Sequence, residues 1–300
     1  WDEKTEDGSL LIARNLDFYA GDDFAKNKVV SFVRPTTGYP YMSVAWAGMI
    51  GNLSGMNSEG LTVTINSGKS DMPLIAKTPI SILAREILQY AKNIDEAVAL
   101  AQKREVFVSE SIMVGSANDH SAALIEVSPN KFGVYKIENT SQLICSNHFQ
   151  SDAYKGDENN NDGIVNSHSQ YRFERMTELL EENPKVNPHK AAAIMRNREG
   201  LQELTIGYGN EKAINQLLAH HSVIFKPEQR QVWVSSNPYQ LGEYVAYDLD
   251  DIFAEPHSGK KSLAIEPLTI PGDSFADSEA FRNYEAFRIQ DRVVDDAINN

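Results

Sequence analysis

GMNSEGLTVTIN, residues 55–66, gives the clearest indication of the fold, because it joins a glycine-bounded turn to an alternating strand. From Leu61 to Asn66, apolar side chains alternate with polar ones. A period of two is typical of a strand with one buried face, and it places Asn66 at the strand's end on the polar face. The stretch therefore predicts a sheet with one face against a core.

On both sides of residues 55–66, the chain alternates between blocks of strands and blocks of helices. Strands are predicted at 9–14, 28–34, 41–47, 111–115, 122–127, 131–137, 142–146, 222–225, 231–235 and 244–248. Helical spacing of apolar residues predicts helices at 80–91, 94–102, 168–182, 188–197, 211–219 and 278–298. Asn93 is expected to cap the second helix, with Glu96 at its third position. Residues 150–166 are predicted to be an irregular polar loop, and 249–274 a wrapping arm. This order predicts an α+β fold with antiparallel sheets and layered helices.

Composition narrows the class of protein. The 300 residues are 41% hydrophobic and 23% charged, enough for one domain over 1–300 in which 250–300 form a C-terminal arm and helix. A net charge of −14 argues against a nucleic-acid binder. No run of eighteen apolar residues is present, so no membrane span is expected. Cys145 is the one cysteine, which excludes an intrachain disulfide and a cysteine-rich metal site. We expect no metal and no cofactor.

Polar residues gather at the ends of three predicted strands. They are Arg14-Asn15-Leu16-Asp17, then Asn66, then Ser146-Asn147-His148. Burying such groups costs free energy unless each finds a partner, so they could converge on one pocket. The alternative is ordinary turn chemistry, since Asn and Asp terminate many strands.

Taken together, these segments resemble the isopenicillin N acyltransferase group of N-terminal-nucleophile (Ntn) hydrolases, the peptidase C45 family, and more distantly the choloylglycine (bile-salt) hydrolases. The resemblance runs over nearly the whole chain. It is carried by DG at 7–8, RNLDF at 14–18, AGMIG at 47–51, GMNSEGL at 55–61, IMVG at 112–115, EVSP at 126–129, NHF at 147–149 and SQYR at 169–172. It implies a four-layer αββα sandwich with two stacked antiparallel sheets.

The resemblance also implies a chemistry, namely cleavage or transfer at a linear amide through an acyl-enzyme. In this family a precursor cuts itself to expose a cysteine, whose thiol is the nucleophile and whose α-amine is the base. By this resemblance Asp17 holds the α-amine, and Arg14 lies near the thiol, where positive charge favours thiolate. Arg14 follows the bile-salt hydrolase pattern more closely than the acyltransferase pattern. Asn147 matches the oxyanion-hole donor, and Asn66 matches a second polar group of the site.

For the remaining candidate site residues, the sequence leaves two or more interpretations open. By the resemblance, Arg172 matches an arginine that pairs with a site carboxylate. One alternative is Arg175, which fits the same alignment, and another is that Arg172 is an ordinary surface arginine on a helix. Phe18, Trp46 and Met49 are candidates for the apolar wall of an acyl pocket, and ordinary core packing is the competing interpretation.

The nucleophile is the departure from the family pattern, because Trp1 heads the chain. We expect the catalytic cysteine just upstream of Trp1, and we expect the chain as printed to lack amidase activity. Cys145 is interpreted as a small buried apolar residue and not as the nucleophile. The abrupt start indicates a processed or trimmed product, which favours a secreted or periplasmic protein over a cytoplasmic one.

Three functions follow from these observations. The first is a hydrolase of linear amide C–N bonds, or an acyltransferase, acting on a small-molecule acyl-amide substrate. The second is an inactive binding protein of the same fold. The third is a lipid esterase or phospholipase-like hydrolase, because the same thiolate would cleave esters. A homo-oligomer is an open possibility, since the last helix could pack on its own domain or on a partner.

Overall fold

The computed structural model describes residues 1–300 except 22–23, 25, 72–74, 255–261 and 300. Within the described residues, the larger of two antiparallel sheets has seven strands in chain order: β2 (Lys28–Val33), β3 (Tyr41–Trp46), β4 (Ser54–Asn57), β5 (Leu61–Ser67), β6 (Glu110–Ser116), β7 (Ser121–Val127) and β8 (Phe132–Lys136). The smaller sheet, counted over the same residues, has the order β1 (Ile12–Leu16), β9 (His221–Lys226), β10 (Gln231–Ser235) and β11 (Tyr244–Asp248). β1 is therefore an edge strand.

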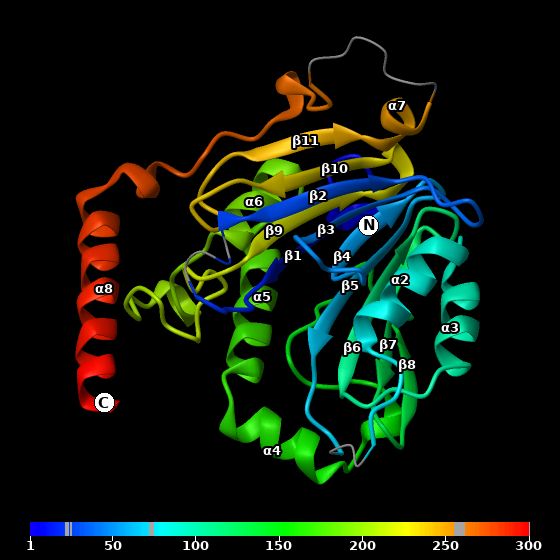
Figure 1. The fold of residues 1–300 in the computed structure, drawn as a ribbon, viewed down its shortest axis with the longest axis horizontal. Coiled ribbons are helices and arrows are strands. Elements are labelled where there is room, and N and C mark those ends of the chain that lie inside the picture. Colours follow the sequence, from blue (N-terminus) through cyan, green and yellow to red (C-terminus); the bar gives the residue numbers. More distant parts are fainter. Residues whose placement is uncertain (22–23, 25, 72–74, 255–261, 300) are drawn as a thin grey trace.

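Helices cover the outer face of each sheet, as Figure 1 shows. α2 (Ile80–Tyr90) and α3 (Ile94–Gln102) pack on the larger sheet, whereas α5 (Ser169–Glu182) and α6 (Pro188–Met195) pack on the smaller one. A third apolar cluster fills the space between the sheets, with Ile12, Met56 and Val223 among its buried members. The predicted four-layer αββα sandwich is confirmed.

The covering helices form where the sequence predicts them, for local reasons. The buried face of α2 carries Leu83, Ala84, Ile87 and Leu88, which are fully buried against the larger sheet. Asn93 caps α3 through its Oδ1, which accepts a hydrogen bond of 2.8 Å from the backbone N–H of Glu96.

Three local predictions are wrong. Residues 142–146 form no strand, because they border a pocket where no neighbouring strand lies. Residues 211–219 form no helix, since Leu217 has a φ of 54°, a left-handed conformation that an α-helix does not contain. The polar segment 150–166 is partly helical, because Asp157 caps α4 (Glu158–Asn166) by accepting from Asn160 N.

The C-terminal part wraps along the smaller sheet and ends in a long helix. α7 (Leu249–Phe253) follows β11, and Ile270 of the arm bridges Tyr244 of β11. The predicted arm at 249–274 includes residues 255–261, which lie outside the described residues. α8 (Glu279–Asn299) stands at the side of the sandwich in Figure 1. No helix in the described part of the chain has both the length and the apolar character needed to cross a bilayer.

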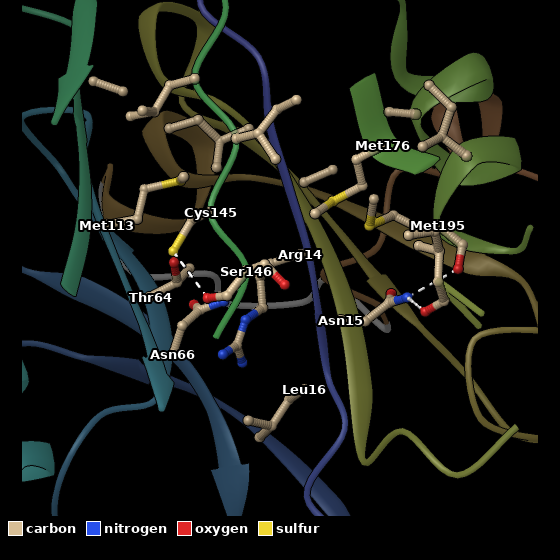
Figure 2. Close-up of a pocket in the computed structure, with 18 of the residues that line it drawn as sticks. Arg14, Asn15, Leu16, Thr64, Asn66, Met113, Cys145, Ser146, Met176 and Met195 are labelled. Carbon is tan, nitrogen blue, oxygen red and sulfur yellow. Dashed lines mark hydrogen bonds between the residues drawn. The ribbon is translucent and has the colours of Figure 1, made fainter. Parts of the chain in front are cut away.

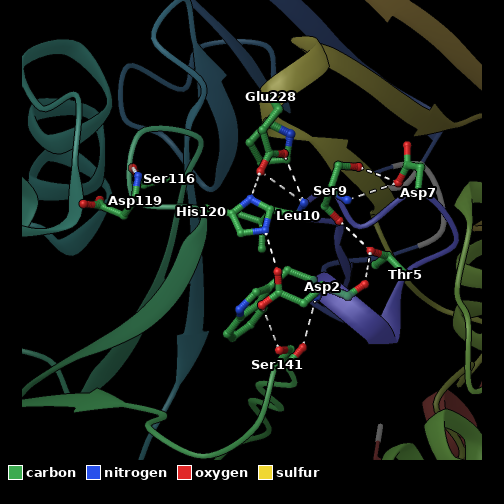
Figure 3. A network of polar contacts seen from close by, with 12 residues as sticks. Asp2, Thr5, Asp7, Ser9, Leu10, Ser116, Asp119, His120, Ser141 and Glu228 are labelled. Carbon is green, nitrogen blue, oxygen red and sulfur yellow. Dashed lines mark hydrogen bonds and ion pairs between the residues drawn. The ribbon is translucent and has the colours of Figure 1, made fainter.

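A polar network centred on His120 holds the first residues of the chain (Figure 3). The Nδ1 of His120 lies 2.8 Å from Glu228 Oε1, and its Nε2 lies 3.0 Å from Asp2 Oδ1. Asp2 also accepts a hydrogen bond from Ser141 Oγ, and Glu228 accepts one from the backbone N–H of Leu10. The network therefore ties the N-terminal segment to turns of both sheets.

Candidate active site

A pocket of about 720 Å³ opens along the edge strand β1. Residues 10–18 all line it, so it extends to both faces of the smaller sheet, because successive side chains of a strand point to opposite faces. In Figure 2, Arg14 points toward Thr64 and Asn66 on one side of the strand, and Asn15 points to the other side. The volume is in the usual range for small-molecule sites.

The residues singled out from the sequence all line this one pocket: Arg14, Asp17, Phe18, Trp46, Met49, Asn66, Asn147 and Arg172. Their convergence follows from the topology, since β1 and the end of β5 lie on facing sheets. The Arg14 guanidinium joins the two by donating to the carbonyl oxygen of Ile65, next to Asn66. Asn147 enters from the segment that precedes α4, and Arg172 from the first turn of α5.

Arg14 is the buried cation of the pocket. Its Nη1 donates a 2.9 Å hydrogen bond to Ser54 Oγ of β4. Burial lowers the pKa of Arg14 to about 10, and the nearby Asp17 carboxylate acts in the opposite direction. The guanidinium therefore keeps its charge at neutral pH and provides a fixed positive potential in the pocket.

Asp17 follows β1 and faces the same space. The residue is exposed to the pocket, but the neighbouring protein still removes part of the water around its carboxylate. This desolvation raises the pKa of Asp17 to about 6, while Arg172 and then Arg14 act to lower it. At pH 7 the carboxylate is ionised, and below pH 6 it becomes neutral. It can hold a cationic amine only in its ionised form.

Asn147 has its amide fixed from both ends. Arg172 Nη2 donates a 2.7 Å hydrogen bond to Asn147 Oδ1, and Asn147 Nδ2 donates a 3.0 Å hydrogen bond to the carbonyl of Ser67. An amide nitrogen has two N–H groups, so this arrangement leaves one for another acceptor. Of the two arginines that fit the alignment, Arg172 lines the pocket, whereas Arg175 is buried beside Glu178, outside the pocket lining.

The backbone around Asn147 is also held. Its N–H donates a 2.8 Å hydrogen bond to Ser169 Oγ at the start of α5. Downstream, the buried Glu126 carboxylate accepts from the backbone N–H groups of Gln150 and Ser151 at 2.7 and 2.8 Å. These contacts give the Asn147 side chain a defined position, which oxyanion stabilisation requires.

Phe18, Trp46 and Met49 form part of one wall of the pocket. The rings of Phe18 and Trp46 stack with centroids 6.2 Å apart, and Phe18 is 53% exposed. Trp46 and Met49 also pack as partly buried residues against the core beneath α2 and α3. All three residues therefore line the pocket, and Trp46 and Met49 also belong to the core packing.

Sequence reasoning missed Glu110, which lines the pocket at the start of β6, and it missed Ser54 and His221 behind Arg14. Burial raises the pKa of Glu110 to about 7, with Arg14 opposing. The available signal was its place directly before the predicted strand at 111–115. Cys145 also lines the pocket, and burial raises the pKa of its thiol to about 12, so the thiol is neutral at pH 7. A neutral thiol is a poor nucleophile. Over the described residues, no cluster of three or more His, Cys, Asp or Glu side chains is arranged to hold a metal ion.

Solved structures with this architecture include three enzymes at low sequence identity. The Caenorhabditis elegans N-acylethanolamine-hydrolyzing acid amidase ortholog has a TM-score of 0.52 and 15% identity, covering 75% of this chain and 90% of that one. Penicillin V acylase from Agrobacterium tumefaciens has a TM-score of 0.54 and 17% identity, covering 82% and 84%. A variant of conjugated bile acid hydrolase from Clostridium perfringens has a TM-score of 0.51 and 13% identity, covering 87% and 94%. The shared architecture is the Ntn-hydrolase fold.

Sequence comparison extends this result. An uncharacterized protein from Archaeoglobus fulgidus is 26% identical over 137 residues, which are 44% of this chain and 23% of that protein. The chain thus matches less than a quarter of the length of this curated relative. The model of the acyl-coenzyme A:6-aminopenicillanic acid acyl-transferase family matches residues 3–238, most of the chain, and the chain belongs to that family.

Proposed function

We propose that the protein cleaves or transfers the acyl group of a linear amide through an N-terminal cysteine thiolate. The observation that carries the proposal is that Arg14, Asp17 and Asn147, far apart in the chain, line one pocket along β1. Each has the chemistry that its proposed role needs, namely a cation for the thiolate, a carboxylate for the α-amine and an amide N–H for the oxyanion.

The steps balance with these groups alone. The neutral α-amine takes the thiol proton, and the thiolate attacks the amide carbonyl to form a tetrahedral oxyanion that Asn147 stabilises. The C–N bond then breaks, and the leaving amine takes the proton from the α-ammonium. Water or a second amine attacks the thioester and restores the thiol. Asp17 holds the ammonium form through its carboxylate, and Arg172 fixes the amide of Asn147.

We place the nucleophile upstream of Trp1, on a strand that pairs with the open edge of β1. Gly8 has a φ of 77°, which suits a tight turn at Asp7-Gly8. In a two-residue hairpin at this turn, Asp17 would face about the third residue before Trp1. To form this hairpin, the 3₁₀ turn at Asp2–Lys4 would have to unwind, and residues 4–6 would have to leave their backbone hydrogen bonds with Val186. Alternate side chains of such a strand would fill the pocket on both faces of the smaller sheet.

The substrate we propose is a small N-acyl amide with an apolar acyl group. The stacked rings of Phe18 and Trp46, with Met49 beside them, offer an apolar surface for that group. Polar groups of the pocket would then meet the amide at one end of the acyl chain.

The test compares two forms of the protein, the chain beginning at Trp1 and the chain extended by its native upstream residues. Amine release from a linear N-acyl amide is measured, with the extended form carrying Cys→Ala at the proposed nucleophile as the control. Activity only in the extended form with its cysteine intact supports the proposal. Equal rates for all three forms would refute it, and cleavage of an ester analogue without any amine release from the amide would identify an esterase instead.

A further inference from the structure

A chain of buried polar side chains runs from the pocket into the space between the sheets. Arg14 Nη1 lies 2.9 Å from Ser54 Oγ, which lies 2.8 Å from His221 Nε2. His221 Nδ1 in turn lies 2.8 Å from His220 Nδ1. Ser54 and both histidines are fully buried, and Arg14 is 6% exposed. Ser54 on β4 thus contacts both β1 and the start of β9 from the facing sheet.

The donor inventory fixes the direction of the first of these hydrogen bonds, and the histidine tautomers set the other two. A guanidinium only donates, so Ser54 Oγ accepts from Arg14. Assigning the Ser54 hydroxyl proton to His221 Nε2, the acceptor within reach, places the proton of His221 itself on Nδ1. That proton is donated to His220 Nδ1, which leaves the His220 proton on Nε2, an atom with no hydrogen-bond partner among the described residues. In the opposite tautomer the Ser54 hydroxyl would lose this acceptor.

The two histidines stay neutral, so Arg14 is the charged member of the four linked side chains. Burial first, and then the neighbouring Arg14, hold the pKa of His221 well below its usual range. Burial and the nearby Lys28 lower the pKa of His220 to about 4. Both imidazoles are therefore neutral at pH 7.

We infer that Ser54 and His221 are positioning residues that hold the Arg14 guanidinium in the pocket; this inference rests on the proposed function. Two contacts fix the guanidinium, Ser54 Oγ and the carbonyl of Ile65. Nε of Arg14 is already buried without a partner among the described residues. Removal of the Ser54 hydroxyl would leave a second orphaned donor on a buried cation, which favours a different rotamer.

A displaced guanidinium would act on the reaction and not only on the fold. The titratable groups that face it are Asp17, Glu110 and Cys145 on the pocket side and His221 behind it. A thiolate formed in this pocket depends on the nearby positive charge, because a cation at close range lowers the pKa of a thiol. Movement of Arg14 therefore raises the pKa of the nucleophile.

The first experiment uses the extended, active enzyme with Ser54→Ala and with the matched control Ser43→Ala. Ser43 is also buried in the larger sheet, and its Oγ donates a 2.8 Å hydrogen bond to Asn52 Oδ1, away from Arg14. Ser54→Ala should lower kcat about 10-fold with little change in KM, and raise the pH midpoint of thiol alkylation by iodoacetamide. Ser43→Ala should move neither. His221→Gln, whose Oε1 can accept from Ser54, should retain more activity than His221→Leu.

The second experiment does not depend on activity. Selective ¹⁵N-histidine labelling of the chain, which has seven histidines, reports the tautomer of each ring by NMR. We expect His221 protonated on Nδ1 and His220 on Nε2 from pH 5 to 9. A proton on His221 Nε2, or equal kcat and thiol pKa for Ser54→Ala and Ser43→Ala, would overturn the inference. If the extended wild-type enzyme cleaves no amide, the proposed function fails, while the tautomers still decide whether the hydrogen-bond chain exists.

Discussion

Replacement of Arg172 by Met tests the arrangement of the site, because it removes both a hydrogen bond to Asn147 and a positive charge near Asp17. The guanidinium donates a 2.7 Å hydrogen bond to Asn147 Oδ1, leaving Ser67 as the remaining anchor of the amide. A hydrogen bond that involves a charged group is worth about 1.5–3 kcal/mol. If that energy is expressed in the transition state, kcat falls by about 10- to 150-fold, and KM changes little.

The same change shifts the pH dependence in a direction that the structure fixes. Arg172 is the larger of the two cationic influences that lower the pKa of Asp17, which burial raises to about 6. Without Arg172, the pKa of Asp17 rises further. Because the carboxylate must be ionised to hold the α-amine, the acid limb of the kcat profile moves to higher pH.

Steady-state kinetics of the extended enzyme from pH 5 to 9 measure both effects. Arg175→Met is the matched control on the same helix, since Arg175 is buried with Glu178 and Asn197 and lies outside the pocket lining. It should lower the unfolding temperature and leave kcat of the folded enzyme near that of wild type. An Arg172→Met enzyme with unchanged kcat and an unchanged acid limb would refute the reasoning.

Three further changes have defined outcomes. Asn147→Ala removes the proposed oxyanion donor, and kcat should fall about 100- to 1,000-fold in the amide-release assay with little loss of thermal stability. Asp17→Asn should abolish activity and yet stabilise the fold at pH 8. The folded-state pKa of the Asp17 carboxyl is raised, so the native state binds more protons than the unfolded state, and the contribution of Asp17 to stability falls as pH rises. The gain in stability should therefore vanish when denaturation is measured at pH 3. For His120, burial lowers the pKa but hydrogen bonds to Glu228 and Asp2 outweigh it, so the pKa is raised. The protonated His120 therefore stabilises the folded state fully below pH 6.5, and this stabilisation is lost as pH rises through the folded-state pKa. His120→Gln should lower the free energy of unfolding in urea by about 0.2–1 kcal/mol at pH 5.5 and by less at pH 9.

The architecture could be predicted because the strongest sequence signals are local. Alternation at Leu61–Ser67 and helical spacing at Ile80–Tyr90 each report a buried face, and both elements appear where the pattern places them. The placement of Asp17 and Asn147 in one pocket depended on the family resemblance, since residues so far apart carry no pairwise signal in one sequence.

The errors arose where tertiary contacts override local pattern. Residues 142–146 look like a strand, but a strand forms only beside a partner, and the pocket takes that place. The apolar residues of 211–219 are buried individually in an irregular segment, so their spacing imitates a helix. Nothing in the sequence indicates that Ser54 contacts Arg14, because a serine on a strand becomes informative only once Arg14 is known to point at it, and His221 looks like an ordinary structural histidine.

The most direct test of the central claim is mass spectrometry of the extended protein quenched during turnover of a linear N-acyl amide. We expect an acyl adduct on the N-terminal peptide, at a cysteine a few residues before Trp1, and no adduct after Asn147→Ala slows the reaction. An adduct on Cys145, or acylation and turnover by the chain that begins at Trp1, would contradict it.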